Sequence, residues 1–157
     1  MPAVDERIAA VLALNNAHAQ QVSVLDEVGL RALLRQAFHA PIIGNVDAFL
    51  VALDQTAEYA SPNFVWFQAR YARFAYVDRL VVSPSARGRG LARQMYAGLF
   101  QTAANAGHTV VLCEVNQEPP NPASDALHAA LGFQGVGEAT MYGGSKTVRY
   151  MARQMPA

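Results

Sequence analysis

A glycine-containing segment at the start of a predicted helix is the strongest chemical signal in the sequence. It follows the strand-like apolar run Leu80-Val81-Val82 and opens a helical pattern that extends to Ala103. The segment reads Arg87-Gly88-Arg89-Gly90-Leu91-Ala92. The first N–H groups of a helix lack partners within it, the helix dipole favours negative charge there, and glycines let a phosphate approach the backbone. The segment therefore predicts an anion site that suits a pyrophosphate.

Two common phosphate motifs do not fit this segment. The nucleoside-triphosphate loop needs Lys followed by Ser or Thr after its glycines, and that pair is missing here. The dinucleotide fingerprint needs a third glycine or an alanine where Arg93 stands. Taken alone, the segment leaves an ordinary strand-to-helix turn as the alternative to phosphate binding.

One charged residue inside an apolar run is the first candidate for acid–base chemistry. Glu114 lies in the predicted buried strand Thr109–Val115, and burial raises the pKa of a carboxyl group towards the range that a base needs. Asp78, in the predicted strand Tyr76–Val82, is the rival base, and Tyr76 on the same strand face could order a water. Alternatively, Glu114 faces solvent or pairs with a structural arginine.

The single cysteine and the histidines offer fewer chemical options. Cys113 should point to the opposite strand face from Glu114, and we expect it to be a buried core residue. A nucleophile paired with His128 or His108 is the alternative. The four histidines have no metal-ligand spacing, so we expect no metal site. They are His18, His39, His108 and His128.

Elements with regular patterns must position these residues. Apolar spacing predicts helices around Ile8–Leu14 and Val28–Leu34, the second capped by Asp26. Asn121-Pro122 is typical of a helix start, and Gly132 would end that helix. Strands are predicted at Ala48–Leu53, Phe64–Phe67, Tyr76–Val82, Thr109–Val115 and Thr147–Met151. Helices followed by alternating strands and helices indicate a mixed α/β fold.

Composition excludes several classes of protein. The 12 basic and 12 acidic residues give zero formal charge, so we expect no nucleic-acid partner. The sequence has no apolar run of membrane-spanning length and no recognisable secretory signal, so we expect no membrane partner and a cytoplasmic location. An exposed edge of the final strand could pair two copies as a homodimer.

Two ordered motifs resemble the GCN5-related N-acetyltransferase (GNAT) superfamily. Its pyrophosphate signature, Gln/Arg-x-x-Gly-x-Gly/Ala, is similar to residues 87–92. A second signature resembles Asn121-x-x-Ser124-x-x-x-His128-x-x-x-Gly132-Phe133. The family usually has Ala or Ser at the second place and Tyr where His128 stands. The resemblance is firm over residues 76–133 and weakest in the N-terminal helices.

The resemblance implies a fold and an activity. The fold would be α/β, with a central, mostly antiparallel mixed sheet whose middle strands splay apart and whose faces carry helices. Residues 1–157 would form a single domain. The activity would be transfer of an acetyl group from acetyl-CoA to a primary amine, by direct attack in a ternary complex.

The resemblance also implies roles in binding the cofactor. Backbone groups of Leu80, Val81 and Val82 would pair with the pantetheine arm, and one N–H would polarise the thioester carbonyl. The backbone N–H groups of residues 87–92 would hold the pyrophosphate, and Asn121 would hydrogen-bond the cofactor.

The catalytic roles follow the same resemblance. Some family members carry their base glutamate where Glu114 stands. His128 replaces the tyrosine that usually protonates the leaving thiolate, and a histidine can donate that proton. The alternative for His128 is a packed or surface histidine.

The acceptor amine is indicated less directly. Six of the fourteen aromatic residues fall within Phe64–Tyr76, where they form either core or an apolar wall for the acceptor. Arg70, Arg73 and Arg79 are interleaved and could bind an acceptor carboxylate. We therefore expect a small-molecule amine or amino acid as acceptor. The alternatives are an N-terminal α-amine of a protein, an acyl-CoA-binding sensor without turnover, or another phosphate-ligand protein.

Overall fold

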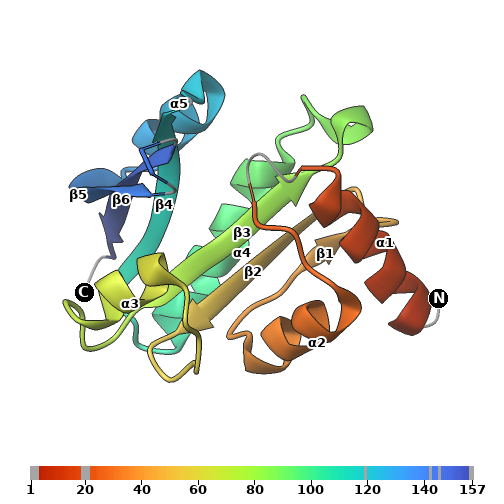
Figure 1. The fold of residues 1–157 in the computed structure, drawn as a ribbon, viewed down its shortest axis with the longest axis horizontal. Coiled ribbons are helices and arrows are strands. Elements are labelled where there is room, and N and C mark those ends of the chain that lie inside the picture. Colours follow the sequence, from red (N-terminus) through yellow and green to blue (C-terminus); the bar gives the residue numbers. More distant parts are fainter. Residues whose placement is uncertain (1–3, 19–21, 119, 142, 145, 156–157) are drawn as a thin grey trace. The chain divides into compact units, whose positions relative to one another are not determined.

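The computed structural model describes residues 4–18, 22–118, 120–141, 143–144 and 146–155, without the side chains of residues 4–6, 118 and 141. The helices are α1 (Val4–Asn16), α2 (Glu27–Gln36), α3 (Pro62–Gln68), α4 (Leu91–Asn105) and α5 (Pro122–Ala130), with a 3₁₀ turn η1 (Pro84–Ala86). The strands are β1 (Ile42–Ile43), β2 (Ala48–Asp54), β3 (Ala75–Val82), β4 (Val110–Glu118), β5 (Gln134–Met141) and β6 (Lys146–Gln154). Figure 1 shows them from α1 in red to β6 in blue.

The strands form one mixed sheet in the order β1-β2-β3-β4-β6-β5. The pairs β1–β2, β4–β6 and β5–β6 are antiparallel, whereas β3 and β4 are parallel. The parallel ladder joins Ala75 to Val111 and Tyr76 to Leu112. The predicted α/β fold with a mostly antiparallel mixed sheet is confirmed. The predicted free edge at the final strand is wrong, because β6 pairs with β4 on one side and β5 on the other.

The chain divides into two compact units. One comprises Met1–Leu53 with Asp78–Leu99, and the other comprises Asp54–Val77 with Phe100–Ala157. Strand β3 and helix α4 each contribute residues to both units. The expectation of one domain over residues 1–157 stays a prediction. Among the described residues, no helix combines the length and the apolar composition that crossing a membrane requires.

The first unit follows its sequence patterns closely. Asp26 caps α2 as predicted, since its carboxylate accepts a 2.7 Å hydrogen bond from the Gly29 N–H. Leu30 and Leu33 of α2 are buried. Every residue of β2 except Asp54 is buried, which explains its unbroken apolar run.

In the second unit, one predicted strand is a helix. Phe64–Phe67 was expected to be a strand, but it lies in α3. Ser61 is the N-cap of this helix and Pro62 occupies its first turn, where the missing proline N–H costs nothing. Phe64 and Phe67 are fully buried on one side of the helix, and their spacing of three residues suits a helix rather than a strand.

Candidate active site

The glycine turn before α4 has the backbone geometry of an anion site. Gly88 and Gly90 adopt φ angles of 81° and 71°, in the region that favours glycine. A Cβ at either position would meet no protein atom within 4 Å, so the turn is open. The helical hydrogen bonds begin with the Gln94 N–H donating to the Gly90 carbonyl at 3.0 Å. The N–H groups of residues 91–93 precede that bond, and a pyrophosphate group fits this turn.

Arg89 links this turn to the β1–β2 hairpin. Its guanidinium donates to the Asp47 carboxylate at 2.9 Å, and the Ser83 N–H donates to the Asp47 carbonyl at 2.8 Å. Both side chains of the ion pair are largely exposed, so the pair contributes little stability. Arg87 is exposed.

The strand residues before the turn differ in burial. Val81 is buried, whereas Leu80 and Val82 are half-buried. Leu91, the first residue of α4, is also buried, while Ala92 is half-buried.

Asp78 and Arg79 form a buried ion pair. The Arg79 Nε donates to Asp78 at 2.7 Å, and both side chains are less than 5% exposed. Arg79 also donates to the Asn15 side chain and to the carbonyl and hydroxyl of Ser23, at 2.8–3.0 Å. Arg79 is therefore part of the buried structure, and the expectation that it could bind an acceptor carboxylate is wrong. The carboxylate of Asp78, the rival base, is already engaged by Arg79 in this ion pair.

The structure brings Tyr76 and Glu114 together. The Tyr76 hydroxyl lies 3.0 and 2.7 Å from the two oxygens of the Glu114 carboxylate and donates to it. Tyr76 is fully buried, and Glu114 is half-buried. A carboxylate that accepts a hydrogen bond from a buried tyrosine hydroxyl is a chemically competent base site.

Tyr150 adds a second aromatic ring beside this carboxylate. Residues Glu114 and Tyr150 are direct partners in the β4–β6 ladder. Burial has the largest effect on the pKa of Tyr150 and raises it. The Glu114 carboxylate raises this pKa further, whereas Arg70 lowers it. The hydroxyl of Tyr150 donates to the Asn63 side chain at 2.8 Å. Sequence reasoning missed Tyr150, because its place beside Glu114 depends on the pairing of β4 with β6.

Trp66 extends the aromatic surface. Its ring stacks on Tyr150 with centroids 4.3 Å apart, and the Arg70 guanidinium lies 3.9 Å from the centre of its ring. Arg70 also donates to the Trp66 carbonyl at 2.9 Å. Arg73 donates to the Ala106 carbonyl at 2.6 Å. Arg70 and Arg73 are both exposed, in contrast to Arg79.

The surroundings of His128 favour the neutral form of its ring. Its Nδ1 lies 2.7 Å from the Ser124 carbonyl, which can only accept, so Nδ1 carries the proton of the neutral ring. Burial lowers the pKa of His128, against smaller raising effects from the Ser124 bond and Asp125. Its ring packs edge-on against Phe133 at 5.2 Å. The neutral ring therefore presents Nε2 as an acceptor, which disfavours the predicted role as an acid.

The remaining predicted residues have structural positions. Asn121 caps α5, its side-chain oxygen accepting a 3.3 Å hydrogen bond from the Ser124 N–H, and its amide N–H₂ remains a donor group. Cys113 is buried, as predicted for a core residue. Within the described ranges, no group of three or more His, Cys, Asp or Glu residues could hold a metal ion.

Solved structures share this fold at low sequence identity. The ribosomal-protein-S18-alanine N-acetyltransferase from Escherichia coli is 16% identical, with a TM-score of 0.67 over 100% of this chain and 92% of that one. The NatC complex bound to Gag peptide and CoA is 14% identical, with a TM-score of 0.73 over 97% of this chain and 92% of that one. Nourseothricin acetyltransferase is 20% identical, with a TM-score of 0.52 over 70% of this chain and 58% of that one. No curated protein matches the chain.

The fold and the glycine turn are those of an acyltransferase that binds a CoA thioester. Residues 30–133 match the model of the acetyltransferase (GNAT) family, which is more than half of the 157 residues. The chain therefore belongs to the acetyltransferase (GNAT) family, and it is an N-acetyltransferase that uses acetyl-CoA.

Proposed function

We propose that this protein transfers an acetyl group to the primary amine of a small molecule or amino acid, with Glu114 as the base. The observation that carries this proposal is the Glu114 carboxylate, which accepts a hydrogen bond from Tyr76 and faces Tyr150 across the strand pair. A carboxylate bordered by aromatic rings suits an ammonium group, which is attracted both by negative charge and by aromatic faces.

The chemistry requires a neutral amine, because an ammonium has no lone pair. Glu114 accepts the proton, directly or through a water, and the amine nitrogen attacks the thioester carbonyl. The new C–N bond forms, and the C–S bond then breaks to release the thiolate of CoA. Asp78 is the weaker candidate for the base, because Arg79 occupies its carboxylate.

The leaving thiolate needs a proton, and His128 was expected to supply it. The neutral ring holds its only proton on Nδ1, bonded to Ser124. We therefore assign the neutral His128 ring a contact with the cofactor sulfur, in which Nε2 accepts a hydrogen bond from the thiol of the product. Only the protonated ring could act as the acid. The proton released by the amine is then available to the thiolate through Glu114 or solvent.

Cofactor binding is assigned to backbone groups. The N–H groups of residues 87–92 would hold the pyrophosphate, since Gly88 and Gly90 leave the turn open. Backbone groups of Leu80, Val81 and Val82 would pair with the pantetheine arm and polarise the thioester carbonyl. The side-chain amide N–H₂ of Asn121 would donate to the cofactor.

The acceptor class is supported by the surroundings of Glu114. Tyr150 pairs with Glu114 across the two strands, Trp66 stacks on Tyr150, and the Arg70 guanidinium lies over the Trp66 ring. A polycation would be repelled by Arg70, whereas an amine with an anionic group would find a partner there. Solved neighbours are named for a ribosomal protein and for nourseothricin, so acceptors differ widely on this fold. A cytoplasmic location and a homodimer remain predictions.

The test is thiol release from acetyl-CoA with amino acids, polyamines, aminoglycosides and short peptides. Glu114→Gln should lower kcat/KM for the active acceptor about 10²- to 10⁴-fold, while acetyl-CoA affinity by calorimetry stays unchanged. Glu138→Gln removes an exposed carboxylate from β5 and should keep full activity.

Three results would contradict the proposal. Full activity of Glu114→Gln would exclude Glu114 as the base. Peptides turning over faster than every small amine would replace the small-molecule acceptor by a protein chain end. Tight acetyl-CoA binding without any acceptor-dependent release would favour the alternative of a sensor without turnover.

A further inference from the structure

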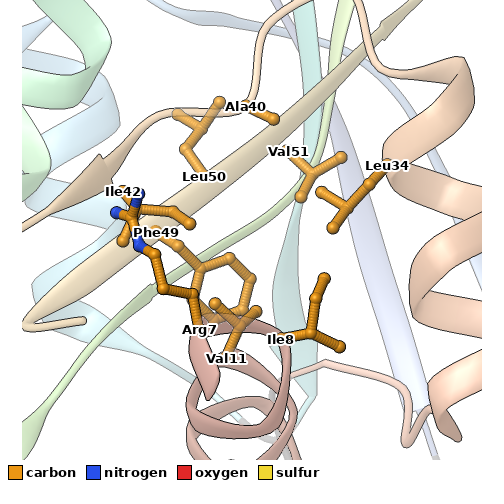
Figure 2. A pocket seen from close by; sticks show the side chains of 9 residues that line it. All are labelled: Arg7, Ile8, Val11, Leu34, Ala40, Ile42, Phe49, Leu50 and Val51. Atoms are coloured by element: carbon orange, nitrogen blue, oxygen red, sulfur yellow. The ribbon is translucent and has the colours of Figure 1, made fainter. Parts of the chain in front are cut away.

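A cavity of about 220 Å³ lies within the first unit, lined by side chains from α1, α2, β1 and β2. Figure 2 shows its lining, in which eight side chains are apolar and one is a guanidinium. The lining residues are Arg7, Ile8, Val11, Leu34, Ala40, Ile42, Phe49, Leu50 and Val51. None of them belongs to the residues assigned to acetyl transfer.

The size of the cavity limits what it can hold. An engineered apolar cavity of about 150 Å³ accepts benzene, so about 220 Å³ accommodates a ring or a short chain with one small polar group. Its walls include Val11, Phe49 and Val51, each no more than 2% exposed. Apolar walls of this kind bind ligands through their apolar parts rather than through hydrogen-bonding groups.

Arg7 is the polar exception in this lining. Arg7 and Ile8 stand four and three residues before Val11, so both share with Val11 the face of α1 that lines the cavity (Figure 2). Arg7 is half-buried, and among the described residues it has no hydrogen-bond or ion-pair partner. A guanidinium on an inner helix face is costly unless it is paired. The partner that matches its planar fork is a carboxylate.

We propose that this cavity binds a small amphipathic carboxylate, with a phenyl ring or a chain of about five or six carbons held by the apolar walls. The carboxylate pairs with Arg7 at the mouth. A single cation and a dry interior favour a monoanion over a phosphate, whose charge Arg7 alone would not balance. The site is separate from acetyl transfer, and its ligand is not consumed there.

Calorimetry on the full chain, without acetyl-CoA, tests the site with hexanoate and phenylacetate as probes. Hexanol and hexylamine are the matched ligands without the negative charge. We expect hexanoate to bind more tightly than both. Arg7→Gln should weaken hexanoate binding about tenfold or more and leave hexanol unchanged. Arg35→Gln, which removes an arginine that does not line the cavity, should leave both unchanged.

A second variant checks the location. Val11→Phe fills the cavity from α1 and should abolish binding of hexanoate, and a thermal melt shows whether the variant is folded. Equal binding of hexanoate and hexanol, with no effect of Arg7→Gln, would reduce the site to a nonspecific apolar cavity. Absence of hexanoate binding, or its displacement by acetyl-CoA, would overturn the proposal.

Discussion

At the scale of single residues, the Glu114 carboxylate accepts a hydrogen bond from the Tyr76 hydroxyl, which lies 2.7 Å from the nearer oxygen. A donor stabilises the charged carboxylate, and its loss makes the group a stronger base that takes up a proton at higher pH. If Glu114 is the base, as proposed, this contact should influence the pH range in which it accepts a proton.

Tyr76→Phe removes the donor and keeps the ring. We expect the acidic limb of the kcat/KM profile to move up by about one pH unit, because a hydrogen bond to a charged group contributes about 1.5 kcal/mol or more. The measurement is acetyl transfer to the best acceptor across pH 5–9. Tyr71→Phe, with the same change on a half-buried ring near Phe67, should leave the profile in place. An unshifted Tyr76→Phe profile would mean that Glu114 does not titrate in the reaction.

The residue-scale contacts differ in how far the sequence anticipates them. Glu114 is visible as a charge in an apolar strand, and Gly88 and Gly90 are visible as a turn before a helix. The partners of Arg79 are not visible, because Asn15 and Ser23 are more than fifty positions away in the chain. Only the folded chain shows that Arg79 is buried, whereas the neighbouring Arg70 and Arg73 stay exposed.

At the scale of elements, the packing of β5 against the Trp66 ring requires a glycine at position 137. A Cβ at Gly137 would lie 2.7 and 2.9 Å from two ring atoms of Trp66, closer than side chains tolerate. The strand also has a register irregularity between Gly135 and Gly137. Gly137 therefore allows the Trp66 ring to reach its stacking position on Tyr150.

Gly137→Ala should displace Trp66 and cost about 1–3 kcal/mol of stability, as other overpacking changes do. Trp66 is the only tryptophan in the chain, so its fluorescence spectrum reports the displacement directly. Urea unfolding gives the loss of stability. Gly135→Ala, whose Cβ would meet the flexible Arg149 side chain at 3.4 Å, should leave the emission unchanged. Identical spectra for Gly137→Ala and the unaltered protein would show that the ring does not need this space.

Elements with clear periodicity or capping were predicted correctly, and short or glycine-rich ones were not. Asp26 and Asn121 cap their helices, as their side chains suggest. Phe64–Phe67 is too short for its apolar run to distinguish helix from strand, and the proline-containing cap decides in favour of the helix. Strand β5 was missed because Gly135 and Gly137 interrupt its alternation, and it depends on pairing with β6.

At the scale of the whole molecule, buried and half-buried histidines couple stability to pH. Burial lowers the pKa of His39, His108 and His128 below the ordinary value of 6.5. These side chains stay neutral in the folded protein at a pH where the unfolded chain already binds protons. Stability is therefore full above about pH 6.5 and falls as the pH decreases towards the lowered values.

His128→Asn should reduce this acid sensitivity. Each histidine kept neutral by folding can add up to about 1.4 kcal/mol per pH unit to the slope, and the asparagine amide can still donate to the Ser124 carbonyl. Urea unfolding between pH 7.5 and 5 measures the slope, which should be shallower in the variant. An equally steep slope would place the acid sensitivity in His39 and His108 or in other groups.

The contact between Gly137 and Trp66 also has an evolutionary consequence. A side chain at position 137 and a large ring at position 66 exclude each other, so the two positions should co-vary in related sequences. Members that carry alanine or a larger residue at the first position should have a smaller residue at the second. Such a pair would change the stack of Trp66 on Tyr150 in one coupled step, next to the proposed base Glu114, and we expect it to change the range of amines accepted.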